Sequence, residues 1–208
     1  MSQPSYAEHI KKRWKTVLLF GVITFFLVTA FIIFFLPFEF RADTQVFIMT
    51  RETSFEAPSY AVVATAERLG ENITHLIETS RSLDYVMEAS GGRIDRTFFP
   101  ENPRKQLNKW KRSIQTSVVP GTGLLRIAVF HPQRDQAALI AQTIADVLAT
   151  HSREYTGFDL EIRQVDAVFT STLPARPSIP LNALLSFLLG CILGSIYVVA
   201  EQERLLKL

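Results

Sequence analysis

A proline-rich segment followed by a long apolar run decides the architecture of this 208-residue chain. The sequence reads LPARPSIP at residues 173–180 and LNALLSFLLGCILGSIYVVA at residues 181–200. Regularly spaced prolines exclude a helix interior, because each lacks a backbone N–H and restricts the residue before it. They predict a stiff, extended segment close to polyproline II. The uncharged run that follows is long enough to cross about 30 Å of hydrocarbon as a helix, so we predict a membrane span there.

A second uncharged apolar run occupies residues 17–36, and Pro37 follows it. Four basic residues lie just before this run: Lys11, Lys12, Arg13 and Lys15. Lys and Arg in short flanks mark the cytoplasmic side of a membrane. A cleaved signal peptide is the alternative, but its apolar core runs for roughly 7–15 residues and a small-x-small cleavage site follows it. The longer run, without such a site, favours a retained transmembrane helix.

The two apolar runs divide the chain into five predicted parts. These are a cytoplasmic tail (1–16), a first transmembrane helix (17–36), an extracytoplasmic domain that ends in the proline-rich elbow (37–180), a second transmembrane helix (181–200) and a cytoplasmic tail (201–208). Acidic and basic residues nearly balance in the outer domain, so the pI near 8.8 reflects the basic membrane flank and gives no sign of nucleic-acid binding. The single cysteine, Cys191, lies in the second run, which excludes an intrachain disulfide.

The outer segment alternates between strand and helix patterns. Alternating apolar residues predict strands at residues 38–49, 115–119, 124–130 and 160–169. Helical periodicity and composition predict helices at residues 60–69, 71–89, 102–114 and 135–155, with Gly70 between the first two. This order predicts an α+β extracytoplasmic domain, with helices packed on a small mixed sheet, between two transmembrane helices.

The sequence contains no pattern that indicates catalysis, a cofactor or a metal. No glycine-rich phosphate loop with a following lysine occurs, and Gly121-Thr122-Gly123 is predicted to be a hairpin turn. The histidines are scattered, and no pair has the helical spacing of a zinc site. No Gly-x-Ser-x-Gly motif occurs, and the one cysteine lies in a predicted span. No spacing among the acidic residues picks out a catalytic carboxylate pair. The two carboxylates of a glycosidase can be remote in sequence, so the exclusion of a glycosidase is weaker than the others.

Two patterns are candidates for contact with a partner. The first is RKQLNKWKR at residues 104–112, which presents Arg104, Lys105, Lys109, Lys111 and Arg112. These side chains could contact anionic lipid, an acidic glycan or a partner protein; the simpler alternative is a solvated helix face with Trp110 in the core. The second pattern is Gly190-x-x-x-Gly194, because small residues at this spacing let transmembrane helices approach closely. Its partner is either the first span or a neighbouring subunit.

Several stretches, taken in order along the chain, carry a resemblance to a known family. They are IKKRWK at 10–15, FRADTQVFI at 40–48, PGTGLLRIAV at 120–129, DQAA at 135–138, and Val165-Asp166 followed by PxxPSxP at 174–180. In this order around two apolar runs, they resemble the Wzz-type chain-length determinants, also called polysaccharide co-polymerases. The resemblance covers nearly the whole chain.

The resemblance implies a bacterial inner-membrane protein that forms a ring-like homo-oligomer and controls the length of a surface polysaccharide built on a lipid carrier. It implies action with a polysaccharide polymerase and a lipid-linked glycan, without catalysis or a cofactor of its own. The structural positions of the family carry over to Pro174, Pro177, Pro180, Gly190 and Gly194.

Two departures from the family pattern keep alternatives open. Leu181 separates Pro180 from Asn182, where the family often has Pro-Asn. The outer domain is short, similar in size to members that act as adaptors for a separate cytoplasmic tyrosine kinase, yet residues 201–208 carry no kinase domain. The alternative function is a two-span sensor or scaffold whose outer domain binds a ligand or partner protein. A membrane-anchored glycan enzyme is a third hypothesis.

Overall fold

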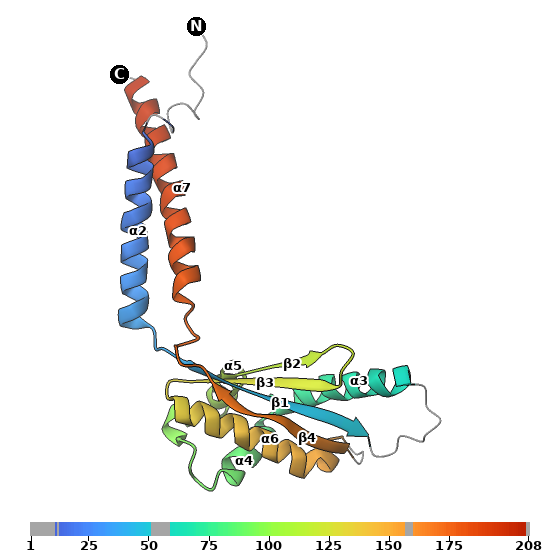
Figure 1. Cartoon of the computed structure of the whole chain (residues 1–208). Helices are drawn as coiled ribbons and strands as arrows, with labels where there is room; N and C mark the ends of the chain where they lie inside the picture. The colour runs from blue at the N-terminus through green and yellow to red at the C-terminus, as the bar shows by residue number, and fades with distance from the viewer. Residues whose placement is uncertain (1–10, 12, 51–58, 157–159, 207–208) are drawn as a thin grey trace. The chain divides into compact units, whose positions relative to one another are not determined.

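The computed structural model describes residues 11, 13–50, 59–156 and 160–206 (Figure 1). The chain forms two compact units. One unit contains residues 1–38 together with 176–208, and the other contains residues 39–175.

The first unit is a pair of long apolar helices, α2 (Trp14–Phe35) and α7 (Ile179–Leu206), which lie side by side (Figure 1). By length and composition, Trp14–Phe35 and Ile179–Glu201 can each cross a membrane. Both helices begin slightly before the predicted spans. Most of their large apolar side chains are exposed rather than packed within the chain, which suits contact with lipid tails.

The proline-rich segment differs in part from the predicted extended elbow. Helix α7 begins at Ile179, so Pro180 lies in its first turn, where the missing N–H costs no hydrogen bond. Pro174 and Pro177 precede the helix, and the Arg176–Pro177 peptide bond is cis. Pro180 therefore belongs to the second helix and does not end an extended segment.

The second unit is an α+β domain built on a four-stranded sheet. Its strands are β1 (Phe40–Thr50), β2 (Ile114–Val119), β3 (Leu124–His131) and β4 (Leu160–Thr170). Between β1 and β2 lie α3 (Ser59–Ile77), α4 (Ser80–Ala89), the 3₁₀ turn η1 (Arg96–Phe98) and α5 (Pro103–Ser113). Helix α6 (Arg134–Thr156) joins β3 to β4. The strand order β2-β3-β1-β4 gives the split β-α-β-β-α-β arrangement (Figure 1).

Every pair of neighbouring strands in this sheet is antiparallel, so the prediction of a mixed sheet is wrong. A helical crossover normally joins strands that run in the same direction. Here a third strand lies between the two strands that each crossover joins, β3 between β1 and β2, and β1 between β3 and β4. The parallel strands are therefore never neighbours.

Helix α3 runs through Gly70, where the sequence predicted a break between two helices. A Cβ at this position would lie 3.0 Å from Cγ2 of Val118, so the missing side chain lets α3 approach β2 closely. The break comes later, where the Thr79 hydroxyl caps α4. The glycine is thus a packing position and not a helix end.

The predicted hairpin turn joins β2 to β3. Gly121 and Gly123 have φ values of 74° and 67°, in the left-handed region that favours glycine. A turn with this backbone returns β3 directly beside β2.

The core of the domain lies between the sheet and helices α3 and α6, which contact it. Alternate side chains of β1 are at most 1% exposed: Ala42, Thr44, Val46 and Ile48. This alternation is the pattern that predicted the strand. Strands β1 and β4 are neighbours, and the N–H of Ala175 donates to the carbonyl of Glu39 (2.8 Å). Both chain connections therefore leave the domain from adjacent backbone segments.

Candidate functional site

Two glycines of the second apolar helix lie against the first. A Cβ on Gly190 would lie 2.7 Å from the carbonyl oxygen of Phe20 and 2.8 Å from Cα of Gly21. A Cβ on Gly194 would lie 2.9 Å from Cβ of Phe20 and 3.0 Å from Cα of Val17. These separations are too short for a side chain, so glycine at both positions lets the two helices touch. The sequence left two partners open for these glycines, the first span and a neighbouring subunit. In the structure, both glycines face the first span of the same chain.

Gly21 completes this contact, and sequence reasoning missed it. Gly21 is buried, and a Cβ there would lie 2.8 Å from Sγ of Cys191. It is the one glycine of residues 17–36, but a single glycine makes no small-xxx-small pattern. Farther along the pair, the guanidinium of Arg13 forms an ion pair with the carboxylate of Glu201. These contacts define an antiparallel helix pair.

We expect the Gly21→Cys chain to form a disulfide with Cys191, because a Cβ at position 21 would lie 2.8 Å from Sγ of Cys191. Membranes containing the Gly21→Cys chain would be oxidised mildly, digested with trypsin and analysed by mass spectrometry for the linked peptides. Leu19→Cys is the matched control, since Leu19 is exposed on the same helix and should give no intrachain link. Failure of Gly21→Cys to link would contradict the helix pairing.

The basic helix α5 is fixed by a cap and by a buried aromatic side chain. The side chain of Asn102 accepts hydrogen bonds from two backbone N–H groups of the first turn, and Pro103 follows it. Trp110 is 1% exposed, and its Nε1 donates to the carbonyl of Ile77 (2.7 Å). The helix is thus part of the domain core on its Trp110 face.

The five basic residues predicted to contact a partner divide into two groups. Four are exposed on the helix surface: Arg104, Lys105, Lys111 and Arg112. The Nζ of Lys109 instead lies 3.4 Å from Oε1 of Glu39 and 4.1 Å from the ring centroid of Phe98. An ion pair and a cation–π contact engage this ammonium group. Lys109 therefore ties α5 to the start of β1.

A buried histidine lies beside this contact. His131 is 2% exposed, its Nδ1 accepts a hydrogen bond from the N–H of Gln133 (3.0 Å), and its Nε2 has no hydrogen-bond partner among the described residues. Burial lowers the pKa of His131, and the ammonium of Lys109 acts in the same direction. A hydrogen bond with the backbone of Gln133 and the carboxylates of Asp95 and Glu39 oppose this effect, but burial outweighs them and the pKa stays below its ordinary value. The ring is therefore held in its neutral form.

We expect the domain to lose stability as the pH falls below about 6.5, the ordinary pKa of histidine. In that range the unfolded chain takes up a proton that folded His131 does not, since its folded pKa is lowered. The free energy of unfolding should fall by up to about 1.4 kcal/mol per pH unit until the pH passes the folded-state pKa. Thermal unfolding of the full chain in detergent, compared with His131→Gln across this range, tests the expectation. Parallel pH profiles for the two proteins would contradict it.

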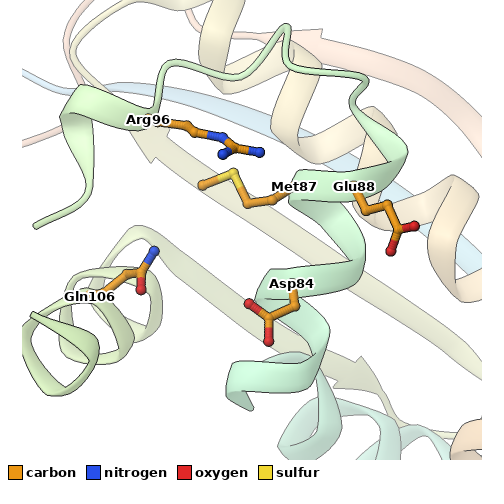
Figure 2. Close-up of a pocket in the computed structure, with 5 residues that line it drawn as sticks. All are labelled: Asp84, Met87, Glu88, Arg96 and Gln106. Carbon is orange, nitrogen blue, oxygen red and sulfur yellow. The ribbon is translucent and has the colours of Figure 1, made fainter. Parts of the chain in front are cut away.

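A cavity of about 330 Å³ opens beside α4 (Figure 2). Five side chains line it: Asp84, Met87 and Glu88 from α4, Arg96 from η1 and Gln106 from α5. Figure 2 shows the side chain of Arg96 extending toward Met87. Sequence reasoning missed this cavity, because its residues come from three elements that only the fold brings together.

Within the described ranges, no group of three or more His, Cys, Asp and Glu side chains is placed to hold a metal ion. No protein-family model matches this chain, and no curated protein matches it either.

Proposed function

We propose that this chain is a polysaccharide co-polymerase of the Wzz type. In this proposal it lies in the bacterial inner membrane and regulates the chain length of a lipid-linked surface polysaccharide, such as O-antigen, capsule or exopolysaccharide. The observation that carries the proposal is that the domain is bracketed by the helix pair. Helix α2 ends at Phe35 and β1 begins at Phe40, while β4 is followed by α7, and β1 and β4 are neighbours in the sheet. A domain tethered at both ends in this way suits a protein that organises a lipid-linked polymer at the membrane surface.

The basic flank of the first span gives the orientation in this proposal. Positive residues before α2 favour a cytoplasmic N-terminus, which makes residues 37–180 extracytoplasmic and the C-terminus cytoplasmic. The chain forms a ring-like homo-oligomer. This oligomer acts with a polysaccharide polymerase and the lipid-linked glycan. A separate cytoplasmic tyrosine kinase is a further candidate partner. The chain itself catalyses no bond chemistry. Three exposed basic residues of α5 could contact acidic glycan, lipid headgroups or a partner protein: Arg104, Lys105 and Lys111.

A two-span sensor or scaffold that binds a ligand is the second candidate, and the polar cavity favours it. The mass of the particle extracted in mild detergent separates the two functions. A ring-forming co-polymerase gives a particle of several chains, whereas a monomer supports the sensor. Turnover of lipid-linked oligosaccharide by the purified chain would overturn the non-catalytic assignment.

Deletion of the gene tests the proposed function directly. Gel electrophoresis of the surface polysaccharide should show a changed length distribution in the deletion strain, and the wild-type gene should restore it. An unchanged distribution would exclude the proposal.

A further inference from the structure

The cavity beside α4 has walls that are fixed by hydrogen bonds outside it. Thr79 caps α4, and Asn102 caps α5. Asp95 caps the turn η1, because its Oδ1 accepts from the backbone N–H of Thr97 (2.8 Å). The side chain of Gln136 on α6 accepts from the N–H of Asp95 (2.9 Å) and donates to a neighbouring carbonyl. The lining side chains are therefore presented from a preorganised backbone.

The three lining residues from α4 share one side of the helix. Asp84 and Glu88 are four residues apart, and Met87 lies at the intermediate spacing of three. The two carboxylates offer only hydrogen-bond acceptors, while the thioether offers an apolar surface. Helix α4 thus supplies acceptors around an apolar patch.

The other two lining residues supply the donors. The guanidinium of Arg96 carries five N–H donors, and the amide of Gln106 both donates and accepts. Within the described part of the chain, the four polar lining side chains form no hydrogen bond or ion pair with protein groups. Their hydrogen-bonding capacity is therefore open to solvent or a ligand.

This combination matches a compact ligand that carries many hydroxyl groups. Each hydroxyl both donates and accepts, so it can donate to a carboxylate while it accepts from the guanidinium or amide. The volume of about 330 Å³ lies at the small end of ligand pockets and suits a mono- or disaccharide unit. Two carboxylates and one guanidinium give the lining a net negative charge, which disfavours an anionic ligand. The guanidinium in turn disfavours a bare metal cation.

We propose that this cavity binds an uncharged sugar unit of a glycan chain. This assignment rests on the proposed function, because a glycan ligand follows from a role in polysaccharide assembly. It specifies that the outer domain holds the polymer by one of its sugar units. Asp84 and Glu88 accept hydrogen bonds from the sugar hydroxyls, Arg96 and Gln106 donate to its oxygen atoms, and Met87 packs against its C–H surface.

Calorimetric titration of the full chain in lipid nanodiscs prepared without sugar-based detergent tests this assignment. The probes are maltotetraose, chitotetraose and the acidic oligomer tetragalacturonate. We expect saturable binding of at least one neutral probe, with tetragalacturonate bound about tenfold more weakly or less. Saturable binding of tetragalacturonate alone, or of none of the three probes, would overturn the proposal.

Variants locate the binding to the cavity. Arg96→Met and Asp84→Asn should each weaken binding of the neutral probe about tenfold, because each removes a charge-assisted hydrogen bond. Arg104→Met is the matched control, since Arg104 is exposed on α5 and does not line the cavity. Thermal unfolding shows whether each variant remains folded. If Arg96→Met or Asp84→Asn does not fold, Gln106→Leu tests the cavity by replacing an uncharged lining residue. Unchanged affinity in the folded cavity variants would refute the site.

The same variants separate this site from the proposed function. If the deletion alters polysaccharide length and the purified chain binds no neutral probe, the co-polymerase proposal stands and the sugar site is wrong. If a neutral probe binds through Arg96 and the deletion leaves polysaccharide length unchanged, the sugar site stands and the co-polymerase proposal is wrong.

Discussion

Replacement of Gly190 with leucine is expected to drive α2 and α7 apart. A Cβ alone at this position would lie 2.7 Å from both the carbonyl oxygen of Phe20 and Oγ1 of Thr24, so the larger side chain has no space. Overpacking of this kind costs roughly 1–3 kcal/mol, and backbone atoms of the facing helix cannot rotate away as a side chain can. In the Gly21→Cys background, the yield of the disulfide with Cys191 should fall sharply.

The control for this substitution lies on the same helix. Ile192→Leu changes a side chain that is exposed on α7, so the yield of the disulfide should remain at the level of the parent. Fractionation of membranes should show both variants inserted, because neither change adds a charge to the apolar helix. An equal yield of the disulfide from Gly190→Leu and the parent would contradict the close helix contact.

Replacement of Trp110 with alanine is expected to have the largest effect on the stability of the outer domain. The indole is 1% exposed, and its N–H is hydrogen-bonded to the carbonyl of Ile77. Removal of a buried aromatic side chain of this size costs about 3–5 kcal/mol, and the substitution also leaves the Ile77 carbonyl without its partner. Thermal unfolding of the full chain, followed by circular dichroism, measures the loss.

A neighbouring residue provides the comparison for Trp110. Lys111 lies next to it on α5 but is exposed, so Lys111→Ala should change the free energy of unfolding by less than about 0.5 kcal/mol. If the two variants unfolded at the same temperature, α5 would not be anchored through Trp110. It would then be the solvated basic helix that its composition alone suggests.

The order of strands and helices could be predicted from the sequence, because local periodicity determines it. The alternation in β1 appears directly as the buried series that includes Ala42 and Val46. Strand neighbours depend on contacts between distant segments, so the antiparallel sheet was not predicted. Gly70 was misinterpreted for the same reason, since its role depends on Val118, which lies far away in sequence.

The candidate site was predictable only where a short motif carries it. Gly190 and Gly194 form such a motif. Gly21 is the single glycine of its apolar run, and its role in the helix contact is visible only once α7 packs against it. Lys109 and its basic neighbours look alike in sequence, but the contact with Glu39 sets Lys109 apart. The cavity lined by Arg96 arises where α4, η1 and α5 pack together. It could not be predicted from the sequence, because the packing of these three elements depends on the fold.

The length distribution of the surface polysaccharide tests the central claim most directly. In the deletion strain, the wild-type gene should restore the parental distribution, while Gly190→Leu should not, although the variant is present in the membrane. Restoration by the wild-type gene alone would support a length regulator that depends on the helix pair. A distribution that is the same with and without the gene would contradict a role of this chain in setting polysaccharide length.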